Sequence, residues 1–159
     1  MKVFRILFVL VVFISCFTGL GCISNAVFEG SSMEPTLKNG DKILVNSNFG
    51  ELNRNDIILF KYPEDERRIY VKRIIALPNE SIEIREGRVF INAEELEEPF
   101  IEQTYNLVKK DMEKIRVPDN HYFVMGDSRD YSSDSRYWGT VRKELILGKY
   151  WMTYSEAKD

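Results

Sequence analysis

The N-terminal stretch constrains this chain more than any other feature of the sequence. From Ile6 to Phe28 there are 23 consecutive residues without a charge, and most are apolar. A helix of that length rises about 34 Å, which spans the roughly 30 Å hydrocarbon core of a bilayer. Lys2 and Arg5 precede it and Glu29 follows it. The positive-inside tendency then places residues 1–5 in the cytoplasm. We predict a single-pass plasma-membrane anchor at residues 6–28, with residues 29–159 outside the cytoplasm.

Two other interpretations of this segment remain open. A basic start followed by an apolar stretch also describes a cleaved secretory signal. Cys22, which follows Leu20 and Gly21, could instead be a lipoprotein-type cysteine. In all three cases the body is exported. No later apolar run approaches this length, so we expect one span and a lipid bilayer as a partner.

The composition of the body excludes several classes of function. Residues 29–159 carry 20 Lys and Arg side chains against 25 Asp and Glu, a net charge of −5. A nucleic-acid partner is therefore not expected, because such proteins need a basic face. Cys16 and Cys22 lie in the apolar stretch, so the body has neither disulfides nor a cysteine metal site. With His121 as the single histidine, we expect no metal and no cofactor.

Past Glu29, short runs rich in β-branched and aromatic residues alternate with turn signals about every ten residues. Helical periodicity is scarce, and a hairpin is expected about Glu86 and Gly87. We predict a mainly β body of coiled antiparallel sheets, barrel-like in form, as a monomer. The expected strands are 42–46, 56–61, 70–76, 82–85, 88–92, 114–117, 122–125 and 149–154.

The residue types leave few choices for a nucleophile. A Ser-His-Asp site needs a histidine, and His121 follows a turn at a strand entrance, where such residues are usually structural or solvated. Cys16 and Cys22 would lie in lipid. What remains is a serine or threonine that is activated by a group other than imidazole, and Ser-Lys pairs are one known solution.

Three segments carry unusual local chemistry. GSSMEPTL at 30–37 places two hydroxyls after a glycine, and such a turn can present a hydroxyl and a backbone N–H together. YVKRIIALP at 70–78 puts Lys72 on one face of an apolar strand and Arg73 on the other. A buried lysine is costly unless it is paired or neutral. MGDSRDYSSDSRYWG at 125–139 packs five charges and four serines into one loop, which suggests ion pairs such as Asp134 with Arg136.

These segments, with GDKILVN and RNDIILFKYP between them, resemble in order the type I signal (leader) peptidases, the membrane-anchored serine proteases that remove signal sequences from exported proteins. The resemblance covers nearly the whole chain. It implies a β-rich catalytic core and a Ser/Lys dyad, with Ser32 as the nucleophile, Lys72 as the general base and Ser132 as the hydroxyl that orients the lysine. It also implies an ion-pair scaffold behind the site, made of Asp127, Arg129, Asp134 and Arg136.

The implied substrates are signal-peptide-bearing preproteins with small side chains one and three residues before the cut. The peptide would bind extended beside the strand leading into Ser32 and the strand carrying Lys72. The substrate-binding residues expected from this are Val27, Phe28, Gly30, Ser31, Met33, Tyr70 and Val71. Because Ser32 follows the apolar segment so closely, we also expect an exposed apolar patch around Met33 at the bilayer interface.

The sequence departs from the family pattern at several positions. Gly30 stands where some members carry a serine whose hydroxyl contributes to the oxyanion site, and Ser128 replaces the usual asparagine. Three alternatives remain. Self-cleaving domains of stress-response repressors also use a Ser-Lys pair, but they lack an anchor. A specialised peptidase that processes one substrate, such as a conjugation-associated one, fits equally well. An inactive, membrane-tethered peptide-binding domain is the non-enzymatic alternative.

Overall fold

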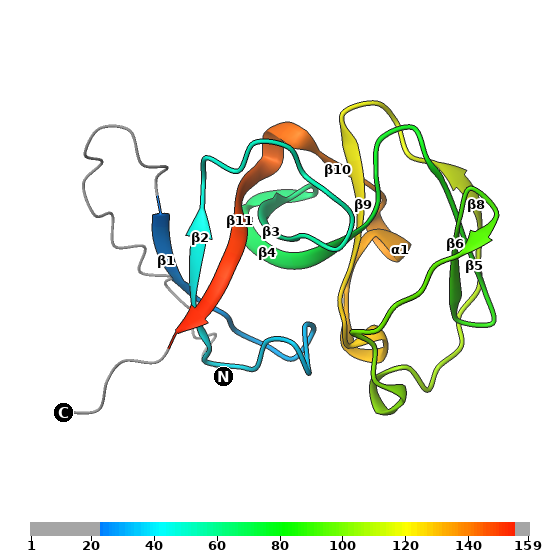
Figure 1. The fold of residues 1–159 in the computed structure, drawn as a ribbon, viewed down its shortest axis with the longest axis horizontal. Coiled ribbons are helices and arrows are strands. Elements are labelled where there is room, and N and C mark those ends of the chain that lie inside the picture. The colour runs from blue at the N-terminus through cyan, green and yellow to red at the C-terminus, as the bar shows by residue number, and fades with distance from the viewer. Residues whose placement is uncertain (1–22, 155–159) are drawn as a thin grey trace, which may run out of the picture.

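The computed structural model describes residues 23–154, and it is built almost entirely of antiparallel strands. A seven-stranded sheet coils through the larger part of the molecule (Figure 1). Its edge strands are β1 and β10. In spatial order its strands are β1 (Ile23–Val27), β2 (Lys42–Asn46), β11 (Ile146–Tyr154), β3 (Ile57–Tyr62), β4 (Asp65–Ala76), β9 (His121–Met125) and β10 (Val141–Arg142).

A four-stranded sheet forms the opposite end of the molecule (Figure 1). Its order is β7 (Glu94–Glu95), β6 (Arg88–Ile91), β5 (Ser81–Arg85) and β8 (Met112–Arg116). The hairpin predicted about Glu86 and Gly87 is present, with Arg85 opposite Arg88. Both turn residues have positive φ, 52° and 74°, as a tight two-residue hairpin requires. The helical pieces of the described chain are single turns: η1 (Gln103–Tyr105), η2 (Arg129–Tyr131), α1 (Ser135–Trp138) and η3 (Lys143–Leu145).

Strand β4 contributes side chains to two hydrophobic clusters, one beside each sheet, and it also carries Lys72. Its register against β9 shifts between Ile74 and Ala76, which marks a bulge. Ile74 packs into a cluster with Ile58 and Phe60 on one side of the large sheet. Beyond the bulge, Ile75 and Ala76 both face the cluster that covers the small sheet. The bulge therefore allows side chains of one strand to pack into two different hydrophobic clusters.

A third core cluster lies beneath β1 and the turn that follows it. Phe28, Met33 and Leu37 pack there against Ile43 and Val45 of β2, and all are buried. At about 25 cal/mol per Å² of apolar surface, each such side chain contributes roughly 1.5–3 kcal/mol to folding. The turn that carries Ser32 is therefore fastened to the sheet at both of its ends.

Two expectations need correction. Residues 23–27 form β1, paired along its length with β2, so the anchor predicted for 6–28 does not continue to Phe28; positions 1–22 lie outside the described residues. The sheets are coiled but open, because β1 and β10 do not pair, so the barrel-like closure is wrong. Within residues 23–154, no helix is long and apolar enough to cross a membrane.

Most of the predicted strands are present with shifted bounds. The predicted strand 70–76 is the second half of a twelve-residue strand that begins at Asp65. The sequence analysis missed β1, β7 and β10. Strand β1 was concealed because its residues continue the apolar run, whereas β7 and β10 have two residues each, too few to show a period.

Candidate active site

Ser32 lies in the turn that leaves β1. Gly30, with φ of 104°, turns the chain out of the strand, and its N–H donates to Asn39 Oδ1 at 2.8 Å. Few other residues adopt this φ without strain. The Ser32 carbonyl accepts the Ser128 N–H at 3.1 Å, which ties this turn to the end of β9. Gly30 therefore sets the direction in which the chain enters the turn that carries Ser32.

Lys72 of β4 reaches the same point from the middle of the sheet. Its Nζ lies 2.8 Å from Ser32 Oγ and 3.0 Å from the carbonyl oxygen of Val71, and it donates to both. Only 5% of the lysine is exposed. The two residues are 40 positions apart in the sequence, so the sheet brings them together. The geometry is that of a nucleophile paired with a base.

The environment of Lys72 favours its neutral form. Burial removes water from the ammonium group and lowers the pKa of Lys72 from 10.5 to about 8, while the negative charges of Asp134 and Asp127 act in the opposite direction. At pH 7 a pKa near 8 leaves about a tenth of the molecules with a free amine, compared with roughly one in 3,000 at a pKa of 10.5. The site therefore holds a usable base at neutral pH.

The two carboxylates near Lys72 are each held by an arginine. Arg73 donates from Nε to Asp127 Oδ1 at 2.8 Å and from a terminal nitrogen to Oδ2 at 2.6 Å. Arg136 binds both oxygens of Asp134, at 2.8 and 2.9 Å. These bidentate pairs fix both carboxylates in place near the lysine. The predicted pair of Asp134 with Arg136 is present, and Arg73 lies on the face of β4 opposite Lys72, as expected.

Arg73 is also the centre of a network that reaches the nucleophile turn. Thr36, four residues after Ser32, donates its hydroxyl to Asp127 Oδ2 at 2.5 Å. Arg73 also donates to the carbonyl oxygen of Asn55 at 2.9 Å, and its guanidinium lies 4.1 Å from the Phe100 ring centroid. Sequence reasoning assigned Thr36 no role and left Arg73 out of the scaffold, because their shared partner Asp127 is distant in the chain.

Arg129, the remaining scaffold residue, links two parts of the loop after β9 through hydrogen bonds with Gly126 and Arg136. Its Nε donates to the Gly126 carbonyl at 3.0 Å, and Glu98 holds both of its terminal nitrogens. Its own carbonyl accepts from Arg136 at 2.7 Å. Glu98 belongs to a stretch that reads as a solvated charged loop, so no sequence signal identified it as the partner of Arg129.

Gly126 permits the close approach on which this arrangement depends. A Cβ at this position would lie 2.3 Å from Ser132 Oγ and 2.3 Å from the Ser32 carbonyl oxygen. No larger residue fits without displacing the nucleophile turn or the Ser132 loop. Ser132 Oγ is buried and has no hydrogen-bond partner in the described structure, so the predicted contact between Ser132 and the lysine is not formed here.

A cavity of about 670 Å³ opens beside the dyad. Apolar groups of β1, β2, β3 and β4 form its walls, and Ser32, Lys72 and Ser133 are part of its lining. Of the predicted substrate-binding residues, Val27, Phe28, Tyr70 and Val71 line this cavity. Three others are not among the lining residues, namely Gly30, Ser31 and Met33.

Met33 differs most from its expectation. It is fully buried in the core beneath β1, so the exposed apolar patch predicted around it is wrong. The described residues do include exposed apolar side chains, but on β1, β4 and β11 and on two loops. The patch was expected because Ser32 follows the apolar segment so closely. The tight turn, in which the Met33 carbonyl accepts the Leu37 N–H at 2.9 Å, turns the Met33 side chain inward.

Among the described residues, neither His121 nor a cluster of metal-ligating side chains forms a second site. His121 is half-buried at the start of β9, and its Nδ1 lies 2.9 Å from the Asp119 carbonyl oxygen in the same turn. Within residues 23–154, no group of three or more His, Cys, Asp or Glu side chains could hold a metal ion.

Comparisons with known proteins show which family this sequence resembles. The family model described as "Signal peptidase, peptidase S26" matches residues 1–155. Signal peptidase I V of Bacillus subtilis is 37% identical over 145 residues, covering 79% of this chain and 85% of the relative. Signal peptidase I of Pseudomonas fluorescens is 33% identical over 181 residues, covering 80% of this chain but 64% of that longer relative.

A solved structure is similar as well. The crystal structure of a signal peptidase I from Enterococcus faecalis V583 aligns with a TM-score of 0.57 at 31% identity. The alignment covers 64% of this chain and 97% of that one. The shared part is therefore a fold as well as a sequence pattern.

Proposed function

This chain belongs to the signal peptidase family, peptidase S26, and is a hydrolase of that family; from that membership and the geometry above, we propose that it removes signal peptides from exported preproteins by Ser/Lys dyad catalysis. The observation that carries the mechanism is the 2.8 Å contact between Ser32 Oγ and the Lys72 Nζ, whose pKa burial lowers to about 8.

In this mechanism the neutral Lys72 amine accepts the hydroxyl proton of Ser32 as Oγ attacks the scissile carbonyl. The Ser32 backbone N–H stabilises the oxyanion of the tetrahedral intermediate. Gly30 has no side chain, so no hydroxyl from that position assists it. The Lys72 ammonium then donates the proton taken from Ser32 to the leaving nitrogen, so the C–N bond breaks, the mature protein leaves with a free amine and an acyl-enzyme remains. The amine of Lys72, neutral again, takes a proton from a water molecule whose oxygen attacks the ester, and it returns the proton to Ser32 Oγ as the signal peptide is freed.

The remaining residues act as supports. Arg73 and Arg136 pair with Asp127 and Asp134, so the carboxylates hold the loop, and desolvation of Lys72 outweighs their stabilisation of its ammonium. A rotation of the Lys72 amine toward Ser132 Oγ, which is unpaired in this structure, would hold the amine through the second step. The apolar cavity receives the residues before the cut in extended form, between β1 and β4, and favours small side chains there.

The location follows from the same proposal. The anchor would be confined to residues within 6–22, with a cytoplasmic N-terminus and the catalytic body outside the plasma membrane. Residues 23–27 belong to β1, so the substrate cavity begins directly after the anchor. A signal peptide leaves its own apolar segment at the same depth, which brings its cleavage region to Ser32.

The test is cleavage of a preprotein in detergent by the full chain and two variants, Ser32→Ala and Lys72→Arg. Arginine keeps the positive charge but has a larger head group that cannot lose its proton, so both variants should lose more than about 1,000-fold in kcat/KM. Matched controls are Ser31→Ala, a neighbouring exposed serine outside the cavity, and Lys61→Arg, an exposed lysine on β3. Activity of Lys72→Arg comparable to wild type would refute the dyad.

A further inference from the structure

Four large side chains stand exposed on two neighbouring loops beyond the dyad. We call them the exit patch: Leu107, Val108, Tyr131 and Tyr137, each between 57% and 72% exposed. Single exposed apolar residues are ordinary, but several gathered on a fixed backbone indicate a contact surface. The exit patch is separate from the apolar cavity, whose lining includes none of the four.

The two loops are held together by specific contacts. The Asp130 carboxylate accepts the N–H of Leu107 at 2.8 Å and that of Val108 at 3.0 Å. Lys110 Nζ donates to the Tyr137 hydroxyl at 3.2 Å. Segments more than twenty residues apart in the sequence are thereby joined into one surface. The loop after β9 therefore holds the backbone of the exit patch in place.

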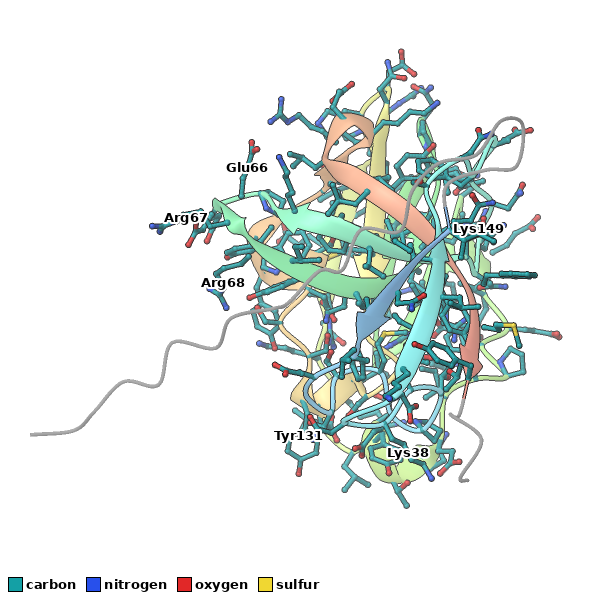
Figure 2. All side chains as sticks on the ribbon, turned by 90° about the vertical axis from the view of Figure 1, so that its left-hand side faces the viewer. Lys38, Glu66, Arg67, Arg68, Tyr131 and Lys149 are labelled. Atoms are coloured by element: carbon teal, nitrogen blue, oxygen red, sulfur yellow. The ribbon has the colours of Figure 1, made fainter. Side chains whose placement is uncertain are left out.

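The exit patch adjoins the dyad end of the cavity. Strand β1 runs toward Ser32, β4 runs from Ile69 toward Lys72, and Ser133 lines the cavity with them. Tyr131 is two residues from Ser133, at most about 7 Å along the backbone. Figure 2 shows Tyr131 projecting at the same end of the molecule as Lys38, which lies in the segment after Ser32.

The segment that carries Leu107 is also tied to the nucleophile turn. Burial, the nearby charge of Glu34 and a hydrogen bond to the Glu34 carboxylate raise the pKa of Tyr105. Glu34 is two residues from Ser32 and its N–H donates to the Ser31 carbonyl at 3.1 Å. The 105–108 segment therefore contacts both the turn that carries Ser32 and the loop after β9.

We propose that the exit patch binds the first residues of the mature protein, on the far side of the cut, and prefers apolar side chains there; the proposal rests on the proposed function. A peptide whose residues before the cut fill the cavity has its scissile carbonyl at Ser32, so its next residues leave at the dyad end. An extended chain advances about 3.3 Å per residue. Residues two to four after the cut then lie about 7–13 Å beyond Ser32, within reach of Tyr131 and the Leu107 loop.

The test uses two preproteins with the same signal peptide and the same small residues before the cut. They differ at positions two and four after the cut, which are Leu in one and Ser in the other. Wild type in detergent should give a kcat/KM about tenfold higher for the Leu substrate, equivalent to about 1.4 kcal/mol. In the double variant Leu107→Ser, Val108→Ser, this preference should fall to about twofold or less. The matched control, Trp151→Ser with Met152→Ser, removes exposed apolar surface from β11 and should keep the tenfold preference.

Several results would overturn the inference. Wild type that cleaves both substrates equally, or a double variant that keeps the full preference, would remove the exit patch from substrate binding while leaving the proposed function intact. A wild type that cleaves neither substrate would instead refute the proposed function. If the double variant lost binding to vesicles of anionic lipid, and cleaved both substrates more slowly by the same factor only when vesicles were present, the patch would be a membrane contact.

Discussion

Replacing Lys72 by methionine should make the protein more stable while abolishing its activity. Methionine has a similar length and no charge, so it can fill the same channel in the sheet. The buried ammonium that it removes is costly: a pKa lowered from 10.5 to about 8 corresponds to about 3 kcal/mol of lost stability at pH 7. The variant should therefore unfold at a higher denaturant concentration than wild type.

The pH dependence of the gain in unfolding free energy shows whether it comes from removing a buried charge or from better packing of the methionine. Below pH 8 the lysine is protonated in both the folded and the unfolded chain, so the full cost is present. Between pH 8 and 10.5 the folded chain has released the proton that the unfolded chain still holds, so the wild type recovers about 1.4 kcal/mol per pH unit. Above 10.5 the difference between variant and wild type should contain only the packing term.

The assay is urea unfolding of the full chain in detergent, followed by tryptophan fluorescence at pH 7, 8, 9 and 10. Lys61→Met, which removes a lysine whose side chain is 43% exposed, serves as the control and should show no comparable pH-dependent gain. A difference in unfolding free energy between Lys72→Met and wild type that stays constant from pH 7 to 10 would refute the reasoning, because the lysine would then titrate alike in both states.

Three further outcomes are expected. The rate of preprotein cleavage should rise with pH and level off near pH 8, as the Lys72 amine loses its proton; a rate that still climbs tenfold per unit at pH 9.5 would contradict this. Gly126→Ala should lose at least about 100-fold in kcat/KM, because its Cβ would collide with the Ser32 carbonyl, and normal activity in a folded variant would show that the turn can move. Arg136→Gln leaves the charge of Asp134 unpaired, so the apparent pKa in the pH–rate profile should move upward from about 8; a folded variant with an unshifted profile would show that this carboxylate has no influence on the amine.

Much of the site could be predicted because its chemistry is local in the sequence. The absence of a usable histidine or thiol in the body left a serine or threonine activated by another group, and the resemblance to the signal peptidases then singled out Ser32 and Lys72. Alternation along β4 placed Arg73 on the opposite face, where it is found. Strands with clear period-two patterns, such as 42–46, were also predicted with their bounds nearly correct.

The predictions failed where a residue's role depends on a distant partner. Thr36, Glu98 and Gly126 carry no local signal, because each acts on a residue that is at least six and up to ninety-four positions away. Met33 was expected at the surface, but the turn directs it into the core. The end of the apolar segment was misplaced for a related reason: an apolar strand that buries one face and an apolar helix have similar composition, and only pairing with β2 distinguishes them.

The sequence thus limited the groups that could react here. Serine and threonine hydroxyls and the amine of Lys72 were candidates, whereas residues 29–159 contain no cysteine and only one histidine. Tertiary structure decided that Ser32 and Lys72 do meet, because the coiled sheet brings the turn after β1 and strand β4, 40 residues apart in the sequence, to within a hydrogen bond and buries the amine at the same time. Both the distance and the lowered pKa depend on atoms that the neighbouring sequence does not contain, so neither could be obtained without the fold.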